Sequence, residues 1–163
     1  MKIGIFTTGG TIDKIYFDMK SEFQVGEPQI EELLHEANIS FDYEISSILR
    51  KDSLELTEED RRLIVEKILS YPNQRILVIH GTDKMVETAK RLESLSGKTI
   101  VLTGSMQPAR FRGSDAVFNI GYAIAAVQLL SPGVYIAMNG QIFYPYKSRK
   151  NVELNKFESI PRG

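Results

Sequence analysis

Residues 75–106 read RILVIHGTDKMVETAKRLESLSGKTIVLTGSM. This stretch contains two short apolar runs, Arg75–Ile79 and Thr99–Leu102. Between them, an apolar stripe at helical spacing runs from Met85 to Leu92. A strand, a helix and a second strand in this order are typical of a parallel sheet with a crossover helix. The stretch therefore predicts an α/β fold.

The same alternation of strands and helices extends over the rest of the chain. Apolar stripes at helical spacing begin at Ile30 and at Ile64, and the second lies behind Thr57, which we expect to cap its helix. The helix predicted over Ser114–Leu130 is apolar on nearly all sides, which indicates a central position. The remaining predicted strands are Lys2–Phe6, Tyr43–Ser47 and Gly133–Met138.

These elements predict one three-layer, flavodoxin-like α/β domain over residues 1–163, with a mainly parallel sheet. A length of 163 residues suits a single domain. The segment between Gly9 and Gly26 has no clear periodicity and combines polar, aromatic and glycine residues. We therefore expect it to be a mobile loop at the functional site.

The composition excludes several classes of chemistry. The chain has no cysteine and only two histidines, which excludes thiol nucleophiles and argues against a metal site. The formal net charge of -1 gives no global field that would attract nucleic acid or an anionic membrane. The N-terminus lacks a signal-peptide pattern, and no apolar stretch is long enough to span a bilayer. We expect a cytoplasmic protein that uses no metal or other cofactor.

Ligands of open α/β sheets bind outside the carboxyl ends of the strands, where several polar motifs of this chain are predicted to lie. Ser105 is one candidate substrate-binding residue at this edge. The motifs that come directly after predicted strands are Thr7–Ile12, His80–Lys84, Thr103–Met106 and Met138–Gly140.

These motifs have structural explanations as well as functional ones. The Thr8–Thr11 stretch is a tight turn in which Thr11 caps the next element, or a turn that presents Thr11 as a nucleophile beside a base. Thr82 or Asp83 is an N-cap, or the two supply a hydroxyl and a carboxylate that binds a substrate ammonium. His80 precedes a glycine, which favours a role in orienting the backbone over a role as a base.

The basic cluster Lys147–Lys150 is either a solvated surface or the source of a lysine that enters the site. A desolvated lysine can lose its proton near neutral pH and then accept one from a threonine hydroxyl. Thr82, Lys150 and Asp83 would then act as the residues of a Ser–His–Asp triad do, with lysine as the base.

Five motifs in register cover nearly the whole chain. They are Thr8–Ile12, His80–Asp83 with Met85–Ala89, Val101–Pro108, Asp115 with Phe118–Asn119, and Met138–Asn139. Together they resemble the N-terminal catalytic domain of the bacterial-type L-asparaginase/glutaminase family. The resemblance implies that family's fold. It also implies hydrolysis of a carboxamide, asparagine or a related amide, to a carboxylate and ammonia through a threonine nucleophile and an acyl-enzyme.

The resemblance also assigns roles to residues. Thr11 corresponds to the primary nucleophile, and Thr82, Asp83 and Lys150 correspond to the second triad of the family. Backbone N–H groups of the glycine turn and of the Thr82 region would stabilise the oxyanion, so that no metal is required. The implied partner is a small-molecule amide.

The chain departs from the family pattern in three respects. Phe23 stands where the family has a tyrosine that assists the nucleophile, and Tyr16 is the candidate substitute. Arg50 and Lys51, before Asp52, stand where the family holds the substrate carboxylate, and we expect them to form a charged fork that does so here. The sequence ends at Gly163, where the family continues into a C-terminal domain, and we expect a protein without that domain.

Two functions from different classes are consistent with these residues. The first is an asparaginase-type amidohydrolase, and the alternative is a non-catalytic binding or regulatory module for an amino-acid-like molecule, derived from an asparaginase domain. The apolar helix Ser114–Leu130 and the absent domain also suggest a homodimer or a higher homo-oligomer, although the helix equally suits the core.

Overall fold

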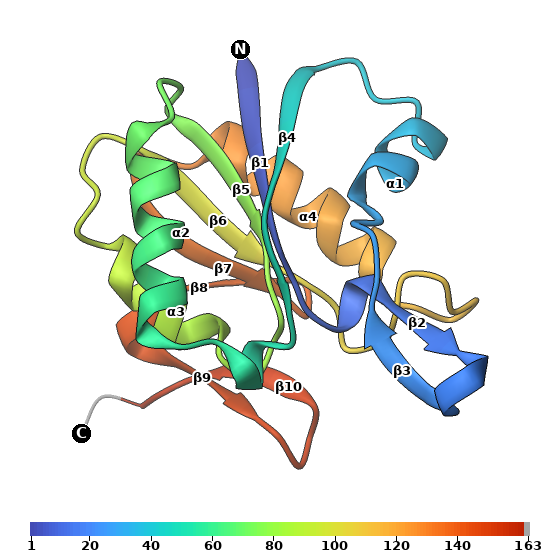
Figure 1. Cartoon of the computed structure of the whole chain (residues 1–163). Coiled ribbons are helices and arrows are strands. Elements are labelled where there is room, and N and C mark those ends of the chain that lie inside the picture. Colours follow the sequence, from blue (N-terminus) through green and yellow to red (C-terminus); the bar gives the residue numbers. More distant parts are fainter. Residues whose placement is uncertain (162–163) are drawn as a thin grey trace.

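The structure is a computed structural model, in which residues 1–161 are described (Figure 1). The five predicted strands and the helices between them are present, and the structure adds strands within residues 14–25 and beyond Met138 that the sequence did not predict. Four short 3-10 turns are interspersed at Thr11–Asp13, Asp18–Lys20, Ser53–Glu55 and Pro145–Lys147. The main elements are β1 Lys2–Gly9, β2 Lys14–Phe17, β3 Glu22–Val25, α1 Ile30–Glu36, β4 Asp42–Lys51, α2 Glu58–Ser70, β5 Arg75–Ile79, α3 Met85–Leu92, β6 Thr99–Thr103, α4 Ala116–Leu129, β7 Gly133–Met138, β8 Gln141–Phe143, β9 Ser148–Asn151 and β10 Lys156–Ser159.

The main sheet has the strand order β4-β1-β5-β6-β7-β8. The first five strands are parallel, and β8 pairs with β7 in the antiparallel direction. Counted along the chain, the parallel strands have the order 2-1-3-4-5, which is the flavodoxin-like order. The predicted fold class is confirmed.

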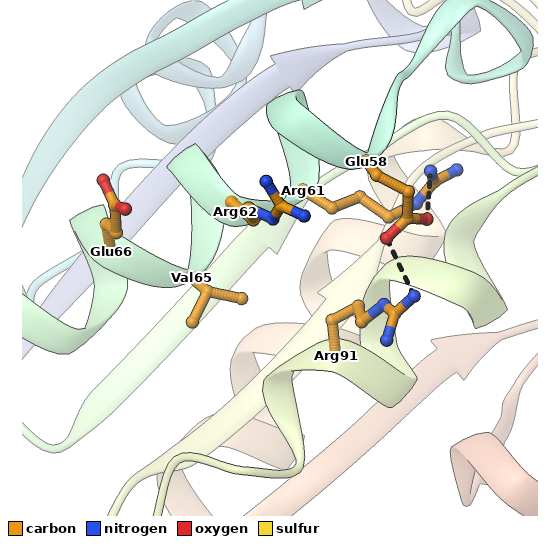
Figure 2. Close-up of a pocket in the computed structure, with 6 residues that line it drawn as sticks. All are labelled: Glu58, Arg61, Arg62, Val65, Glu66 and Arg91. Carbon is orange, nitrogen blue, oxygen red and sulfur yellow. Dashed lines mark hydrogen bonds and ion pairs between the residues drawn. The ribbon is translucent and has the colours of Figure 1, made fainter.

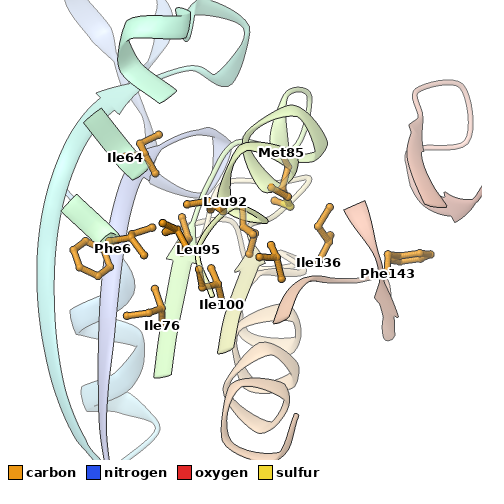
Figure 3. Packing of buried hydrophobic residues seen from close by; sticks show 14 of the residues in the cluster. Phe6, Ile64, Ile76, Met85, Leu92, Leu95, Ile100, Ile136 and Phe143 are labelled. Atoms are coloured by element: carbon orange, nitrogen blue, oxygen red, sulfur yellow. The ribbon is translucent and has the colours of Figure 1, made fainter. Parts of the chain in front are cut away.

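Helices cover both faces of the sheet, with α1 and α4 on one side and α2 and α3 on the other (Figure 1). Side chains of a strand alternate between the two faces. On β5, Leu77 and Ile79 therefore join the cluster under α1 and α4, whereas Ile76 and Val78 join the cluster under α2 and α3. Figure 3 shows the second cluster, in which side chains of β5, β6 and β7 pack against Met85 and Leu92 of α3.

An ion-pair network joins the outer surfaces of α2 and α3 (Figure 2). Glu58 accepts hydrogen bonds from Arg61 at 3.1 Å and from Arg91 at 2.8 Å. These side chains line a cavity of about 360 Å³ that contains none of the predicted site residues. Because Glu58 and Arg91 are more than half exposed, we expect each pair to contribute less than about 1 kcal/mol.

The segment predicted as an irregular loop instead forms a hairpin, so its predicted lack of regular structure is wrong, while its mobility stays a prediction. Strands β2 and β3 pair in the antiparallel direction, with Tyr16 opposite Phe23. The two rings lie 5.4 Å apart in an edge-to-face arrangement, and Phe23 makes a similar contact with Phe111 at 5.7 Å. Cross-strand aromatic pairs stabilise a hairpin whose sequence shows no clean alternation.

Helix α4 covers one face of the sheet, so its predicted central position is also wrong. Its buried side includes Ala116 and Ala123, whereas Val117, Phe118 and Leu129 are 63%, 62% and 83% exposed. Self-association through these exposed residues stays a prediction. Within residues 1–161, no helix has both the length and the apolar character that crossing a bilayer requires.

Helix α2 begins where the sequence predicts, because Thr57 caps it. The backbone N–H of Asp60 donates to the Thr57 hydroxyl at 3.1 Å, and the Asp60 carboxylate accepts from the Thr57 backbone N–H at 2.9 Å. This reciprocal pair is a capping box.

Removal of the Thr57 hydroxyl tests the cap. Thr57→Ala should lower the free energy of unfolding by about 1 kcal/mol, because the Asp60 N–H loses its acceptor. Thr57→Ser keeps an acceptor and should lose clearly less. Urea unfolding followed by circular dichroism measures both variants, and an unchanged midpoint for Thr57→Ala would contradict the capping role.

Candidate functional site

Two glycines bring the loops after β1 and β5 into direct contact. Gly10 has a φ of +95°, and a Cβ built on it would lie 2.5 Å from the backbone nitrogen of Gly81. Only glycine allows such an approach of two backbones. Because Thr11 follows Gly10 and Thr82 follows Gly81, this contact places the two candidate threonines on adjoining loops at the carboxyl edge of the sheet.

Thr11 is the first residue of the 3-10 turn Thr11–Asp13, and its hydroxyl does not cap that turn. The structural explanation of Thr11 as a cap is therefore wrong. No side-chain hydrogen bond among the described residues involves this hydroxyl, whereas Thr8, three residues earlier, donates to the Ile79 carbonyl at 3.0 Å. Thr11 is partly exposed.

Lys150 reaches the loop after β5. Its Nζ lies 2.8 Å from the Thr82 Oγ1 and 2.8 Å from the Asp83 Oδ1, which accept its hydrogen bonds. The Lys150 side chain is only 12% exposed and that of Asp83 is 35% exposed. Helix α3 begins behind Lys84 with no side-chain cap, so the N-cap explanation of Thr82 and Asp83 is wrong. The structure brings together three of the predicted catalytic residues.

The alternation of strand β9 explains why Lys150 turns inward. Ser148 is buried and Lys150 is largely enclosed, whereas Arg149 between them points outward and pairs with Glu158 of β10 at 2.7 Å. Lys147 is exposed. The basic cluster is thus both a solvated surface and the source of a lysine in the site.

His80 is a structural residue. It is fully buried, its Nδ1 lies 2.7 Å from the Gly81 carbonyl oxygen, and its Nε2 lies 2.8 Å from the Thr88 hydroxyl. Burial lowers the pKa of His80 to about 4, which keeps the imidazole neutral at pH 7. This agrees with the predicted role in orienting the backbone.

The loop after β6 packs on the loop after β5, and its Ser105 hydroxyl bonds within its own loop. A Cβ built on Gly104 would clash with the His80 carbonyl oxygen, so this loop rests directly on the loop after β5. Ser105 is 1% exposed and donates to the backbone carbonyl of Gln107. The hydroxyl oxygen can still accept a hydrogen bond, so its predicted contact with substrate stays a prediction.

The predicted carboxylate fork of Arg50 and Lys51 does not form. Consecutive side chains of a strand point to opposite faces. Arg50 pairs with Glu27, while the Lys51 Nζ lies 2.9 Å from a carboxylate oxygen of Asp60 on α2. Arg50 alone therefore faces the side of the hairpin.

Asp52 is held by a cation that the sequence did not point to. The Lys14 Nζ donates to the Asp52 Oδ2 at 2.7 Å. Burial disfavours the charged form of Asp52, but the Lys14 bond, the Leu54 backbone N–H and the nearby Lys150 charge outweigh it and lower its pKa. A cavity of about 360 Å³ between the hairpin and the end of β4 is lined by Lys14, Phe23, Arg50 and Asp52, among others.

Tyr16 does not reach Thr11 through a hydrogen bond. It lies on β2 with its side chain 52% exposed, and its ring packs on Phe23. Its assisting role stays a prediction. Phe23, the residue without a hydroxyl, lines the cavity instead.

Residues 2–163 match the family described as "Asparaginase, N-terminal". The chain belongs to the asparaginase family. It is 30% identical over 173 residues to the L-asparaginase of Thermococcus kodakarensis, a match that covers 98% of this chain and 51% of that protein. It is 28% identical over 134 residues to the glutaminase-asparaginase of Acinetobacter glutaminasificans, which covers 78% of this chain and 39% of that protein.

Solved structures of asparaginases agree with the fold. The thermostable L-asparaginase from Thermococcus kodakarensis superposes with a TM-score of 0.83 at 28% identity, covering 100% of this chain and 52% of that one. L-asparaginase I from Vibrio cholerae superposes with a TM-score of 0.81 at 27% identity, covering 97% of this chain and 51% of that one. The chain thus spans about half the length of the L-asparaginases that it matches.

Sequence reasoning missed two polar residues of this asparaginase-family site. Ser53 is 2% exposed, its Oγ accepts from the Lys84 backbone N–H at 3.2 Å, and a Cβ on Gly81 would meet its side chain at 2.7 Å. Lys14 lies in the segment predicted as a loop. No signal in the sequence links Lys14 to Asp52, 38 positions away.

The glycine contact can be tested with a control from the same chain. Gly97 also has a positive φ, of +75°, but a Cβ there would meet nothing within 4 Å. Gly97→Ala should therefore lower the free energy of unfolding by about 1–2 kcal/mol, the cost of the backbone conformation alone. Gly10→Ala should lower it further, because the Gly81 loop must also shift.

Urea unfolding of the two glycine variants gives this comparison. Equal losses of unfolding free energy for Gly10→Ala and Gly97→Ala would mean that the close approach of Gly10 to Gly81 is not a constraint on the fold.

Proposed function

We propose that the chain is an asparaginase-type amidohydrolase that converts a carboxamide to a carboxylate and ammonia through Thr11. The observation that carries the proposal is the pair of 2.8 Å contacts from Lys150 to Thr82 and Asp83, on the loop that touches the Thr11 turn. Burial of a lysine beside a hydroxyl and a carboxylate adds little to the stability of the fold. The enclosure of Lys150 therefore favours a chemical role over a structural one.

In the first step, the Thr11 Oγ attacks the amide carbon. The negative charge that develops on the amide oxygen is stabilised by backbone N–H groups of the glycine turn and of the Thr82 loop. The C–N bond then breaks, and the Thr11 proton ends on the leaving nitrogen as ammonia is released. An ester between Thr11 and the acyl group remains.

In the second step, water hydrolyses this ester. Lys150 in its neutral form accepts a proton from the water through Thr82, and the hydroxide equivalent attacks the ester carbon. The C–O bond breaks, the proton held by Lys150 passes to the Thr11 Oγ, and the product acid gives its remaining proton to solvent and leaves as a carboxylate. Asp83 stabilises the charged form of Lys150 between these transfers.

The names of the relatives support this reaction class, since they are described as L-asparaginases and a glutaminase-asparaginase. One solved relative, from Campylobacter jejuni, is described as a probable cytoplasmic L-asparaginase, which supports the predicted location. Lys14, Arg50 and Asp52 offer charges of both signs to a substrate in the cavity beside the hairpin. Asparagine is therefore the first substrate to test.

Ammonia release identifies the substrate. Asparagine, glutamine, N-acyl amides and short peptides form the panel, and we expect release from at least one of them. Saturable binding of an amide without any release, lost in Asp83→Ala, would contradict the enzyme and favour a binding module.

Substitution of the proposed machinery tests the mechanism. Thr11→Ala and Lys150→Met should each lower kcat for ammonia release by at least about 10²-fold, because each removes a nucleophile or a proton-transfer group. Lys147→Met removes an exposed cation three residues away and should leave kcat unchanged. A Lys150→Met variant as active as Lys147→Met would exclude the lysine from the reaction.

A further inference from the structure

Asp13 is a buried carboxylate beside the proposed nucleophile, and the mechanism does not use it. It is the last residue of the turn that begins with Thr11, and it is 2% exposed. Its Oδ1 accepts one hydrogen bond, from the Gln29 backbone N–H at 2.9 Å. Its Oδ2 is buried without any partner among the described residues.

Asp13 also fixes the base of the β2–β3 hairpin. Its backbone carbonyl accepts from the Gly26 N–H at 2.8 Å, directly beyond the paired ends of the two strands. Asp13, Gly26 and Gln29 thus hold the Thr11 turn, the end of the hairpin and the start of α1 together. We refer to these three residues as the hairpin base.

The charged groups around the hairpin base are engaged elsewhere. Arg50 of β4 is near enough to favour the charged form of Asp13, but its guanidinium pairs with Glu27. Lys14 of β2 pairs with Asp52, and Arg110, from the loop before α4, donates to the Gln29 side chain at 3.1 Å. None of these cations bonds to Asp13.

We propose that Asp13 is a positioning residue that keeps the hairpin base ready to open, because the closed base buries a carboxylate oxygen that has no hydrogen-bond partner. A buried polar atom without a partner destabilises the state that buries it. Opening of the base exposes that oxygen to water and frees both the hairpin and the turn that carries Thr11. The link to catalysis rests on the proposed function, whereas the opening itself does not.

The titration of Asp13 gives the direction of the effect. Burial raises the pKa of Asp13 to about 6 from its ordinary value of 3.8, although the Gln29 N–H and Arg50 act in the opposite sense. The closed base therefore binds the proton more tightly than the open base. Below about pH 4 both states are protonated, and above pH 6 both are ionised, so a rise in pH between these values favours opening.

The size of the effect can be calculated from the same two values. If exposure restores the ordinary pKa of 3.8, the opening equilibrium should rise about tenfold between pH 5 and pH 7.5. At neutral pH the hairpin base then opens more often, which admits amide and releases product at Thr11. Motions of this kind limit kcat in many enzymes.

Hydrogen exchange of the full chain, followed by NMR, measures the opening directly. The probes are the amides of Gly26 and Gln29, corrected for intrinsic exchange, with the buried amides of β5 as the internal reference. We expect their protection to fall about tenfold from pH 5 to pH 7.5 relative to β5. Constant protection in the unsubstituted protein would overturn the proposal without the need for any variant.

Asp13→Asn keeps the acceptor for Gln29 and removes the titrating charge, so the pH dependence of protection should disappear. Asp18→Asn, the same change at an exposed position on the tip of the hairpin, should leave it intact. An equal fall of protection in Asp13→Asn and in the unsubstituted protein would overturn the role of Asp13.

Activity supplies a second, separable readout. At pH 7.5, Asp13→Asn should lower kcat for ammonia release several-fold without a matching rise in KM, and this deficit should shrink as the pH falls from 7.5 to 5. A constant ratio of the two kcat values would overturn the link to catalysis. Absence of ammonia release from the unsubstituted protein would instead reject the proposed function, and the exchange result would still stand.

Discussion

Gly10 and Gly81 touch backbone to backbone, and the candidate site is built on that contact. The loops after β1 and β5 leave neighbouring parallel strands, so they start side by side at the carboxyl edge of the sheet. A side chain on Gly10 would force the two loops apart, and a side chain on Gly81 would clash with Ser53. Gly104 repeats this close approach against the His80 carbonyl. The glycines thus set the spacing between the threonines that the proposed chemistry needs.

The charged part of the site comes from a different region of the chain. Lys150 lies beyond the antiparallel edge strand β8, and the β9–β10 hairpin carries it back to the loop after β5. Asp83 and Thr82 then enclose the ammonium, and Asp52, tied to Lys14, adds a second carboxylate nearby. Cations and carboxylates from four separate segments therefore balance one another where the sheet edge opens.

Polar groups beneath the site fall into two classes. His80, Thr8 and Thr103 are fully or almost fully buried, and each has a hydrogen-bond partner, so they fix the loops rigidly. Within residues 1–161, Asp13 is as deeply buried but leaves one carboxylate oxygen unpaired, and the buried Thr7 hydroxyl of β1 also has no partner. The rigid support thus lies under the loop after β5, and the weak point lies under the hairpin. This arrangement suits a site in which the loop after β5 stays fixed while the β2–β3 hairpin moves to admit substrate.

The layers of the fold and the motifs at the strand ends can be inferred from local sequence patterns. Apolar periodicity marks β5, α3 and β6, and turn chemistry marks the start of α2 at Thr57, because these signals act between residues close in the chain. The order of the strands in the sheet and the family relationship could also be inferred from the sequence. The positions of Thr11, Thr82 and Asp83 at one edge could be inferred from the parallel topology alone.

Which side chains meet could not be inferred from the sequence and depends on the folded structure. It turned Lys150 inward and Arg149 outward, split Arg50 from Lys51, paired Lys14 with Asp52, and ordered the hairpin through Tyr16 and Phe23. The physical reason is that strand alternation reverses a side chain with every one-residue shift of register. Contacts across dozens of residues also leave no local pattern. The free oxygen of Asp13 is likewise visible only once every possible donor has been placed around it.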